Sequence, residues 1–298
     1  MKSSKSLLLP LTLLLTVLIA PFARGQGNTS TNLHCVWKVT GTSNTVYLVG
    51  SIHLLKPSDY PLAAAIEAAF TNSQIVAFET DIGKMEDPAL QLGILGKVTL
   101  PEDQTLEDQL SPETWKAFTN HVDQAGLPLF MFSRFKPVMA AMTLEVLEIQ
   151  KLGVDETHGL DLHYYHIAKE EGKRIVPLET VDFQLGLITD FTKEEGEAMM
   201  KSELKDIDTA SQQFDELMQS WRTGDTKKLA SLLNDGMVEF PAIFKRLLTD
   251  RNDRWVPKVQ EFLSGNKNVA VIVGAGHLVG SYGVVEMLKN KGFKVTQL

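Results

Sequence analysis

The chain has 298 residues, a formal net charge of −8, 44% hydrophobic and 22% charged residues, and one cysteine. The negative charge argues against nucleic acid and anionic membrane surfaces as partners. A single cysteine excludes a disulfide within the chain, and we expect Cys35 to be a quiet buried thiol. A chain of this size buries a full core without such a staple.

The first segment, residues 1–25, predicts a cleavable signal peptide. Two early lysines precede an apolar stretch from Leu7 to Ile19, and small residues follow before Gln26. Because the apolar run is short and Pro10 interrupts it, we favour a secretory signal over the alternative of an uncleaved anchor. We therefore expect an exported protein, periplasmic or secreted, without stable membrane insertion. The remainder, 26–298, is expected to be a single domain.

The next residues predict β structure around one helix. Two alternating runs, 36–39 and 45–49, flank a turn and predict a β-hairpin. Asp59 and Pro61 predict the start of a helix that ends near residue 70. A short buried strand follows over 74–78, and this strand–helix–strand order calls for a parallel pair of strands.

Two long helical insertions are predicted, at roughly 82–157 and 185–263. Between them, Gly-Leu-Asp at 159–161 opens a helix, and a strand follows over 174–178. Strands and one helix return at the end of the chain, over 268–273, 284–289 and 294–297. The fold class predicted is α/β, a mixed sheet with parallel core strands, helices on its faces and a large helical insertion.

Four polar side chains stand at predicted strand ends: His53, Glu79, Glu179 and His277. In an open α/β sheet, chemistry collects at the carboxyl ends of the parallel strands. Both histidines close a Gly-x-x-His that follows an apolar run. The alternative for the pair is a capping histidine and a satisfied core histidine. Glu179 is equally well explained as a supporting group or as the start of a helix.

Two imidazoles and one carboxylate form an ordinary ligand set for a divalent metal, with open positions for water or substrate. We therefore expect His53, Glu79 and His277 to bind metal, which would activate a water and polarise a carbonyl. Without metal, a Glu–His pair can still act as base and orienting group. The structural alternative for Glu79 is an ordinary salt bridge.

Two further clusters remain open. Asp250-Arg251-Asn252 with Arg254, expected between two helices, is either a solvated capping cluster or a guanidinium that holds a carboxylate in the crevice. A second group offers an alternative metal site on one helix, but Asp161 is expected to cap that helix and the histidines to be structural. Its members are His158, Asp161, His163 and His166.

Common catalytic signatures are absent from the sequence. It contains no phosphate loop, Gly-x-Ser-x-Gly elbow, His-Glu-x-x-His helix or cysteine pair. This argues against the common nucleotide-binding, serine-hydrolase and zincin classes.

Five motifs follow one another in a characteristic order and spacing: Gly50-Ser51-Ile52-His53, Phe78-Glu79-Thr80-Asp81, residues 159–180 with Gln184, Asp250-Arg251-Asn252 with Arg254, and Gly274-Ala275-Gly276-His277. In these motifs the chain resembles the TraB/GumN family from about Val36 to Gln297. That family belongs to a superfamily that includes the Tiki Wnt-cleaving proteases, the erythromycin esterases and the haem-iron-binding ChaN proteins.

The resemblance implies an active site built from the two Gly-x-x-His motifs and the acidic residue. Carried over, His53, Glu79 and His277 are the expected metal and catalytic residues, with Arg251 as their polar partner. It implies Mn²⁺ or Co²⁺ as cofactor, with Zn²⁺ or iron as further options. The function expected is a metal-dependent hydrolase, most simply a peptidase, acting on a peptide or small molecule. The alternatives are a haem, iron or small-ligand binding protein without turnover, and a metal-independent esterase.

Overall fold

A six-stranded mixed sheet lies at the centre of the computed structural model, which describes residues 33–234 and 236–298. The strand order is β4-β3-β5-β2-β1-β6. The four strands from β4 to β2 are parallel neighbours, whereas β1 pairs antiparallel with both β2 and β6. The predicted mixed sheet with a parallel core is thereby confirmed. The strands are β1 (Val36–Thr40), β2 (Thr45–Ser51), β3 (Ile75–Phe78), β4 (Arg174–Pro177), β5 (Val269–Gly274) and β6 (Val295–Gln297).

Strand β5 is the middle of the parallel part. Every one of its residues is buried, and it pairs with β2 on one side and β3 on the other. A parallel strand covered on both faces favours such a continuous apolar run. The parallel direction expected for β2 and β3 is right, but they are not neighbours, because the late strand β5 lies between them.

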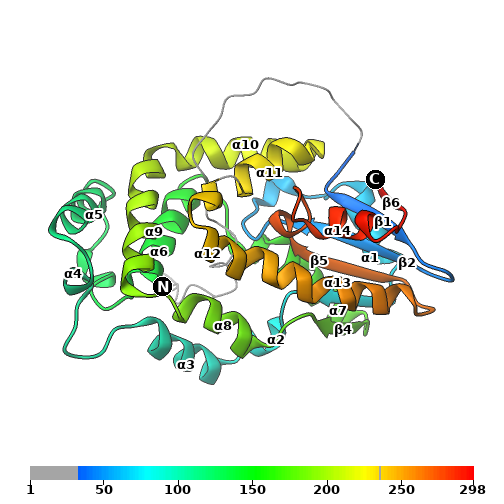
Figure 1. Cartoon of the computed structure of the whole chain (residues 1–298), viewed down its shortest axis with the longest axis horizontal. Coiled ribbons are helices and arrows are strands. Elements are labelled where there is room, and N and C mark those ends of the chain that lie inside the picture. The colour runs from blue at the N-terminus through cyan, green and yellow to red at the C-terminus, as the bar shows by residue number, and fades with distance from the viewer. Residues whose placement is uncertain (1–32, 235) are drawn as a thin grey trace, which may run out of the picture.

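Helices cover the sheet and build a separate helical region beside it (Figure 1). In that view α13 and α14 lie in front of the sheet, and α3 to α6 gather at the opposite end of the molecule. The α-helices are α1 (Ala64–Thr71), α2 (Ile82–Met85), α3 (Pro88–Val98), α4 (Leu106–Gln109), α5 (Pro112–Gln124), α6 (Pro137–Gln150), α7 (Leu160–Glu170), α8 (Val181–Thr189), α9 (Lys193–Asp206), α10 (Ala210–Thr223), α11 (Thr226–Asn234), α12 (Pro241–Phe244), α13 (Asp250–Leu263) and α14 (Val284–Asn290). Short 3-10 turns are η2 (Pro57–Asp59), η3 (Leu129–Met131), η4 (Glu156–His158), η5 (Ile207–Thr209), η6 (Gly236–Glu239) and η8 (Ala275–His277), and η7 (Lys245–Thr249) is a π-helical turn.

Helix α6 ties the helical region to the sheet. It is buried on almost every side, as expected of a helix without a polar stripe. Val146 and Ile149 join the large hydrophobic cluster around the sheet. Met142 and Leu144 join two further clusters within the helical region. One helix thus contributes to all three clusters and fixes the helical region against the sheet.

One predicted helix begins later than expected. Asp59 does not start α1. Its carboxylate accepts a hydrogen bond from the Lys56 backbone N–H at 2.7 Å and closes the short turn η2. Helix α1 begins only at Ala64. The expected buried thiol is confirmed, because Cys35 is free and fully buried, and burial raises its pKa to about 12.

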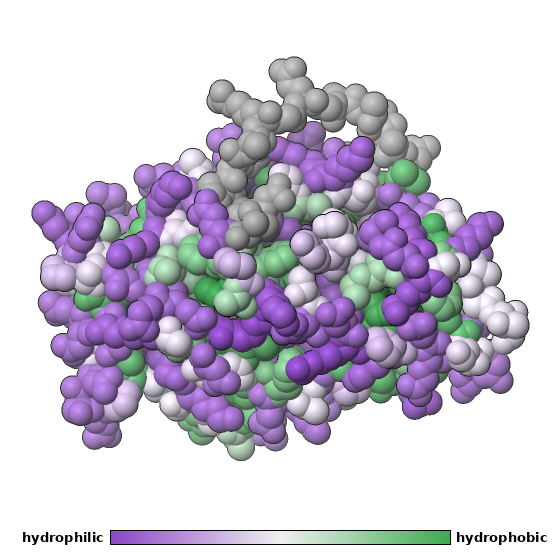
Figure 2. Space-filling model, in the orientation of Figure 1, coloured by the Kyte–Doolittle hydropathy of each residue, from purple (hydrophilic) through white to green (hydrophobic). Residues whose placement is uncertain are grey.

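The described residues do not bear on export or on the assignment of domains. The predicted signal peptide lies outside the described residues, so export stays a prediction, as does the assignment of 26–298 to a single domain. Among the helices that the structure describes, none is long and apolar enough to cross a membrane. Figure 2 shows mostly hydrophilic side chains over the visible face, with smaller hydrophobic areas between them.

Candidate active site

The four polar strand ends lie at one edge of the sheet. His53 follows β2, Glu79 follows β3, Glu179 follows β4, and His277 lies in η8 directly after β5. Because these strands are adjacent and parallel, their carboxyl ends open onto the same crevice. The structure therefore brings together all four side chains that the sequence singled out.

Close packing explains the first glycine of the site. A Cβ added to Gly50 would lie 3.2 Å from the Cβ of Ala275, so a side chain there would press on the loop that carries His277. The first Gly-x-x-His thus lets the second one approach. Trp221 fixes the same point by donating its indole N–H to the Gly50 carbonyl at 2.8 Å.

Arg251 is the centre of the buried part of the site. It lies in the first turn of α13 rather than between helices, and its side chain is 0% exposed. Its Nη2 donates to Glu79 Oε2 at 2.5 Å, and its Nε and Nη2 both donate to the Glu179 carboxylate, at 2.9 to 3.1 Å. Of the two alternatives for this cluster, the structure shows the guanidinium that holds carboxylates in the crevice. A buried guanidinium requires such partners, because an unpaired buried charge costs several kcal/mol.

The ion pair with Arg251 determines the protonation state of Glu79. Burial raises the pKa of this carboxyl, but the Arg251 guanidinium and the Gly274 backbone N–H, 2.7 Å from Oε1, outweigh burial and lower it to about 2. Gln184 Nε2 also donates to Oε2, at 3.3 Å. Glu79 is therefore ionised at neutral pH. For Glu179 burial wins, and its pKa is raised above its ordinary value despite Arg251.

His277 is a neutral imidazole with both ring nitrogens engaged. Its Nε2 lies 2.9 Å from Arg251 Nη1 and its Nδ1 lies 2.7 Å from Asn252 Oδ1. Arginine can only donate, so Nε2 is the acceptor and Nδ1 carries the proton. Burial first, and Arg251 second, lower the pKa of His277 to about 3. The ring packs on Trp255, with 4.4 Å between centroids.

His53 is paired with a carboxylate that the sequence reasoning placed elsewhere. Its Nδ1 lies 2.5 Å from Asp161 Oδ2, and the Ser51 hydroxyl donates to the other oxygen of the same carboxylate. Burial lowers the pKa of His53, but the charge and hydrogen bond of Asp161 raise it, and the net direction is upward. Within the described part of the chain, His53 Nε2 has no hydrogen-bond partner.

Asp161 corrects an expectation. It was expected to cap its helix, but the N-cap of α7 is Gly159, which makes no side-chain cap. A Cβ on Gly159 would lie 2.3 Å from the His53 carbonyl oxygen, so glycine lets α7 begin directly against the His53 loop. This close start of α7 places Asp161, in the first turn of the helix, next to the His53 imidazole. Asp161, Ser51 and Asn252 are thus residues of this site to which the sequence alone assigned no role in it.

The remaining candidates lie outside this constellation. His163 packs against the Tyr60 ring with 4.7 Å between centroids, and His166 lies 3.5 Å from Glu86 on the surface. Arg254 is exposed and stacks on Phe183 instead of reaching the crevice. His163 and His166 thus lie outside the constellation, whereas Asp161 of the same helix belongs to it.

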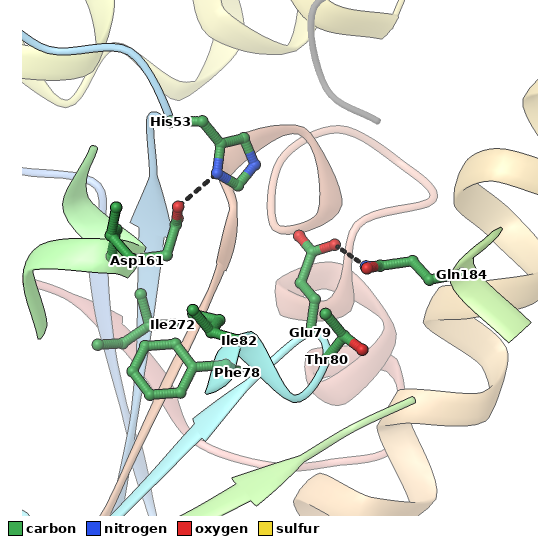
Figure 3. Close-up of a pocket in the computed structure, with 9 residues that line it drawn as sticks. His53, Phe78, Glu79, Thr80, Ile82, Asp161, Gln184 and Ile272 are labelled. Atoms are coloured by element: carbon green, nitrogen blue, oxygen red, sulfur yellow. Dashed lines mark hydrogen bonds and ion pairs between the residues drawn. The ribbon is translucent and has the colours of Figure 1, made fainter. Parts of the chain in front are cut away.

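A small pocket opens between the two halves of the site (Figure 3). It offers about 40 Å³ for the centres of water-sized molecules, enough for a water and a small chemical group. In Figure 3, His53 and the Glu79 carboxylate border the pocket from two sides, and Asp161 lies below the imidazole, joined to it by a hydrogen bond. The pocket is lined by His53, Phe78, Glu79, Thr80, Ile82, Asp161, Leu162, Gln184 and Ile272.

The predicted metal ligands do not fit a metal as they are arranged. The His277 lone pair is already used by Arg251, and the ionised Glu79 carboxylate is already paired with the same guanidinium. Among residues 33–234 and 236–298, no group of three or more histidine, cysteine, aspartate or glutamate side chains is placed to hold a metal ion. The metal requirement stays a prediction, and the arrangement instead offers an Asp–His pair and an ionised glutamate facing one pocket.

Comparison with known proteins places this site in a family context. Residues 35–297 match the model of the TraB/PrgY/gumN family. The uncharacterized protein YbaP of Escherichia coli (strain K12) is 25% identical over 248 residues, which cover 82% of this chain and 87% of YbaP. The YbaP of Shigella flexneri matches with the same identity and coverage. No solved structure matches the chain at a comparable level of significance.

Proposed function

This chain belongs to the TraB/PrgY/gumN family, and from that membership and its pocket we propose that it is a hydrolase of ester or amide bonds. In this proposal His53 is the general base that activates a water. The observation that carries it is the Asp161–His53 pair, with the free Nε2 of the ring at a pocket large enough for water.

The Asp161–His53 pair has the geometry of a base and its orienting group. Asp161 holds Nδ1 at 2.5 Å, which fixes the tautomer with the proton on Nδ1 and the lone pair on Nε2. The lone pair takes a proton from water while the water oxygen bonds to the substrate carbonyl carbon. The carbon–oxygen or carbon–nitrogen bond then breaks, and the leaving group takes the proton back from Nε2. Asp161 stabilises the imidazolium between the two steps.

Glu79 orients the water in this scheme. Its Oε1 accepts a single hydrogen bond, from the Gly274 N–H, so it retains a lone pair for the second hydrogen of the water. Arg251 keeps the carboxylate ionised and in place. In this scheme Glu79 therefore neither takes up nor releases a proton.

No step of this scheme passes through a metal, in keeping with the donor set. An experiment therefore distinguishes this proposal from the metal-dependent peptidase that the resemblance implies. Purified protein is assayed on a panel of p-nitrophenyl esters and fluorogenic peptides, before and after exhaustive chelation. Activity that survives chelation supports the proposal, whereas activity lost on chelation and restored by Mn²⁺ would establish the metal route instead.

Two variants complete the test. His53→Ala should abolish hydrolysis while the thermal melt changes little, since the ring makes one side-chain hydrogen bond. The matched control is His166→Ala, an exposed histidine on α7, which should keep full activity. A panel without any hydrolysed substrate, or a fully active His53→Ala protein, would refute the proposed function.

A further inference from the structure

The cation of the site is not available to a substrate. Each of the five N–H groups of the Arg251 guanidinium already has a protein partner. Nε donates to Glu179, Nη1 to the Leu247 carbonyl at 3.3 Å and to His277, and Nη2 to Glu79 and Glu179. The side chain is completely buried and does not line the pocket. Arg251 therefore cannot hold a substrate carboxylate or phosphate.

The pocket wall presents acceptors. Two carboxylates line it, Glu79 and Asp161, and no lysine or arginine of the described residues does. Each of Glu79 Oε1, Asp161 Oδ1 and Asp161 Oδ2 accepts one hydrogen bond and keeps a further lone pair. One guanidinium also faces two carboxylates, so the buried cluster behind the wall supplies no unbalanced positive charge to the pocket. An anionic group in the pocket would be repelled, and a cationic one attracted.

The remaining wall is apolar. Phe78, Ile82, Leu162 and Ile272 supply it, and in Figure 3 the Phe78 ring lies beside Ile272, apart from the two carboxylates. Alkyl groups on a cation pack on such an apolar surface. A strongly hydrated inorganic cation would gain nothing from these side chains, whereas an alkylated ammonium uses both parts of the wall.

We infer that the substrate carries an organic ammonium group close to its scissile carbonyl, and that this pocket binds it through Glu79, Asp161 and the apolar wall. The inference rests on the proposed hydrolase function for its location beside His53. Substrates with a carboxylate or phosphate in that position are rejected.

Three acetate esters test the inference: acetylcholine, its neutral isostere 3,3-dimethylbutyl acetate, and the anionic 3-acetoxypropanoate. We expect kcat/KM for acetylcholine to exceed that of the neutral ester by about tenfold or more at low salt, with the anion slowest. Equal or reversed preference would overturn the inference, even with clear hydrolysis. Binding of choline, 3,3-dimethylbutan-1-ol and 3-hydroxypropanoate, measured by calorimetry, gives the same ranking without turnover. If no ester is cleaved, this binding series still decides the inference, while the proposed function fails.

A charge placed in the pocket provides the matched variant. Leu162→Arg adds a cation to the wall and should reduce the preference for choline over its neutral analogue by about tenfold. Leu92→Arg adds the same charge on α3, at a side chain that is 68% exposed, and should leave the preference unchanged. An unchanged preference in a folded Leu162→Arg protein would contradict binding of the cation at this wall.

Discussion

Arg251 Nη2 lies 2.5 Å from Glu79 Oε2, and this contact joins α13 to the end of β3 across 172 residues of sequence. The same guanidinium binds Glu179 and His277. One buried cation thus connects three of the four strand ends that form the site. The geometry of the pocket depends on it, although it never touches the pocket.

Removing this cation should be costly. Arg251→Leu leaves two buried carboxylates without compensation, and we expect the free energy of unfolding to fall by about 3–5 kcal/mol. Urea denaturation at pH 7 measures it. Arg254→Leu, three residues along the same helix, removes an exposed guanidinium stacked on Phe183 and should cost about 1 kcal/mol or less. Equal losses in the two variants would show that the buried network is not stabilised as described.

Asp161 should set the pH dependence of activity. In the proposed mechanism His53 acts as a base when it is neutral, so the rate should rise as pH rises through the pKa of His53, which lies above its ordinary value of 6.5. Asp161→Asn removes the charge and the hydrogen bond of Asp161, the two largest causes that raise this pKa, and leaves burial, which lowers it, against the weaker upward effect of the Glu79 charge. We expect the midpoint to move to lower pH, and kcat to fall by about 10²–10⁴ because the ring loses its orienting group. A pH–rate profile measures both effects.

The control for this profile is Asp182→Asn. The Asp182 side chain is 89% exposed, and its ion-pair partner is Lys97 instead of His53. Its profile should superimpose on that of the parent. An Asp161→Asn protein with an unchanged midpoint would rule out Asp161 as the partner that controls the base.

Glu79 should contribute to acid lability. Its folded pKa, about 2, lies below the ordinary 4.5, so its stabilisation is present above pH 4.5 and is lost as pH falls from 4.5 toward 2. The difference corresponds to about 3 kcal/mol. Glu79→Gln should be less stable at pH 6 and should lose less stability between pH 6 and pH 3 in urea unfolding. Glu113→Gln, at an exposed position of α5, should follow the parent, and a parallel loss in Glu79→Gln would contradict the assigned ion pair.

Thr80 should matter for turnover and not for folding. Its buried hydroxyl lines the pocket and finds no hydrogen-bond partner in the described chain. Thr80→Val keeps the shape and removes an unsatisfied polar group, so the melting temperature should hold or rise. Because the hydroxyl is free for a substrate, we expect kcat/KM to fall by about tenfold. Thr80→Ser should retain activity, and a fully active Thr80→Val protein would exclude contact with the substrate.

The sequence predicts the sheet well because its strands are buried apolar runs. Runs such as VAVIVG need no knowledge of distant partners to be recognised, and the edge where they end follows from parallel pairing. The order of the strands within the sheet is harder to predict from the sequence. Nothing local in β5 indicates that it inserts between β2 and β3, since that depends on which crossover packs best.

The candidate site is predictable in part for the same reason. His53, Glu79, Glu179 and His277 follow strands and so share an edge. Asp161 does not follow a strand, and the first turn of a helix already explains an aspartate there. Its actual partner lies 108 residues away, and no local pattern reports a contact of that separation.

The late position of β5 also governs when the native structure can form. The strand that joins the two sides of the sheet begins only at Val269, after both helical insertions. Until β5 is present, β2 and β3 each lack the strand that lies between them. His53 and Glu79 then stand on two parts of the sheet that are not yet joined. Contacts of such long sequence separation make folding slow and dependent on a nearly complete chain. A chain truncated before Val269 is therefore expected to keep at most the β1–β2 and β3–β4 pairings and to show none of the proposed hydrolysis.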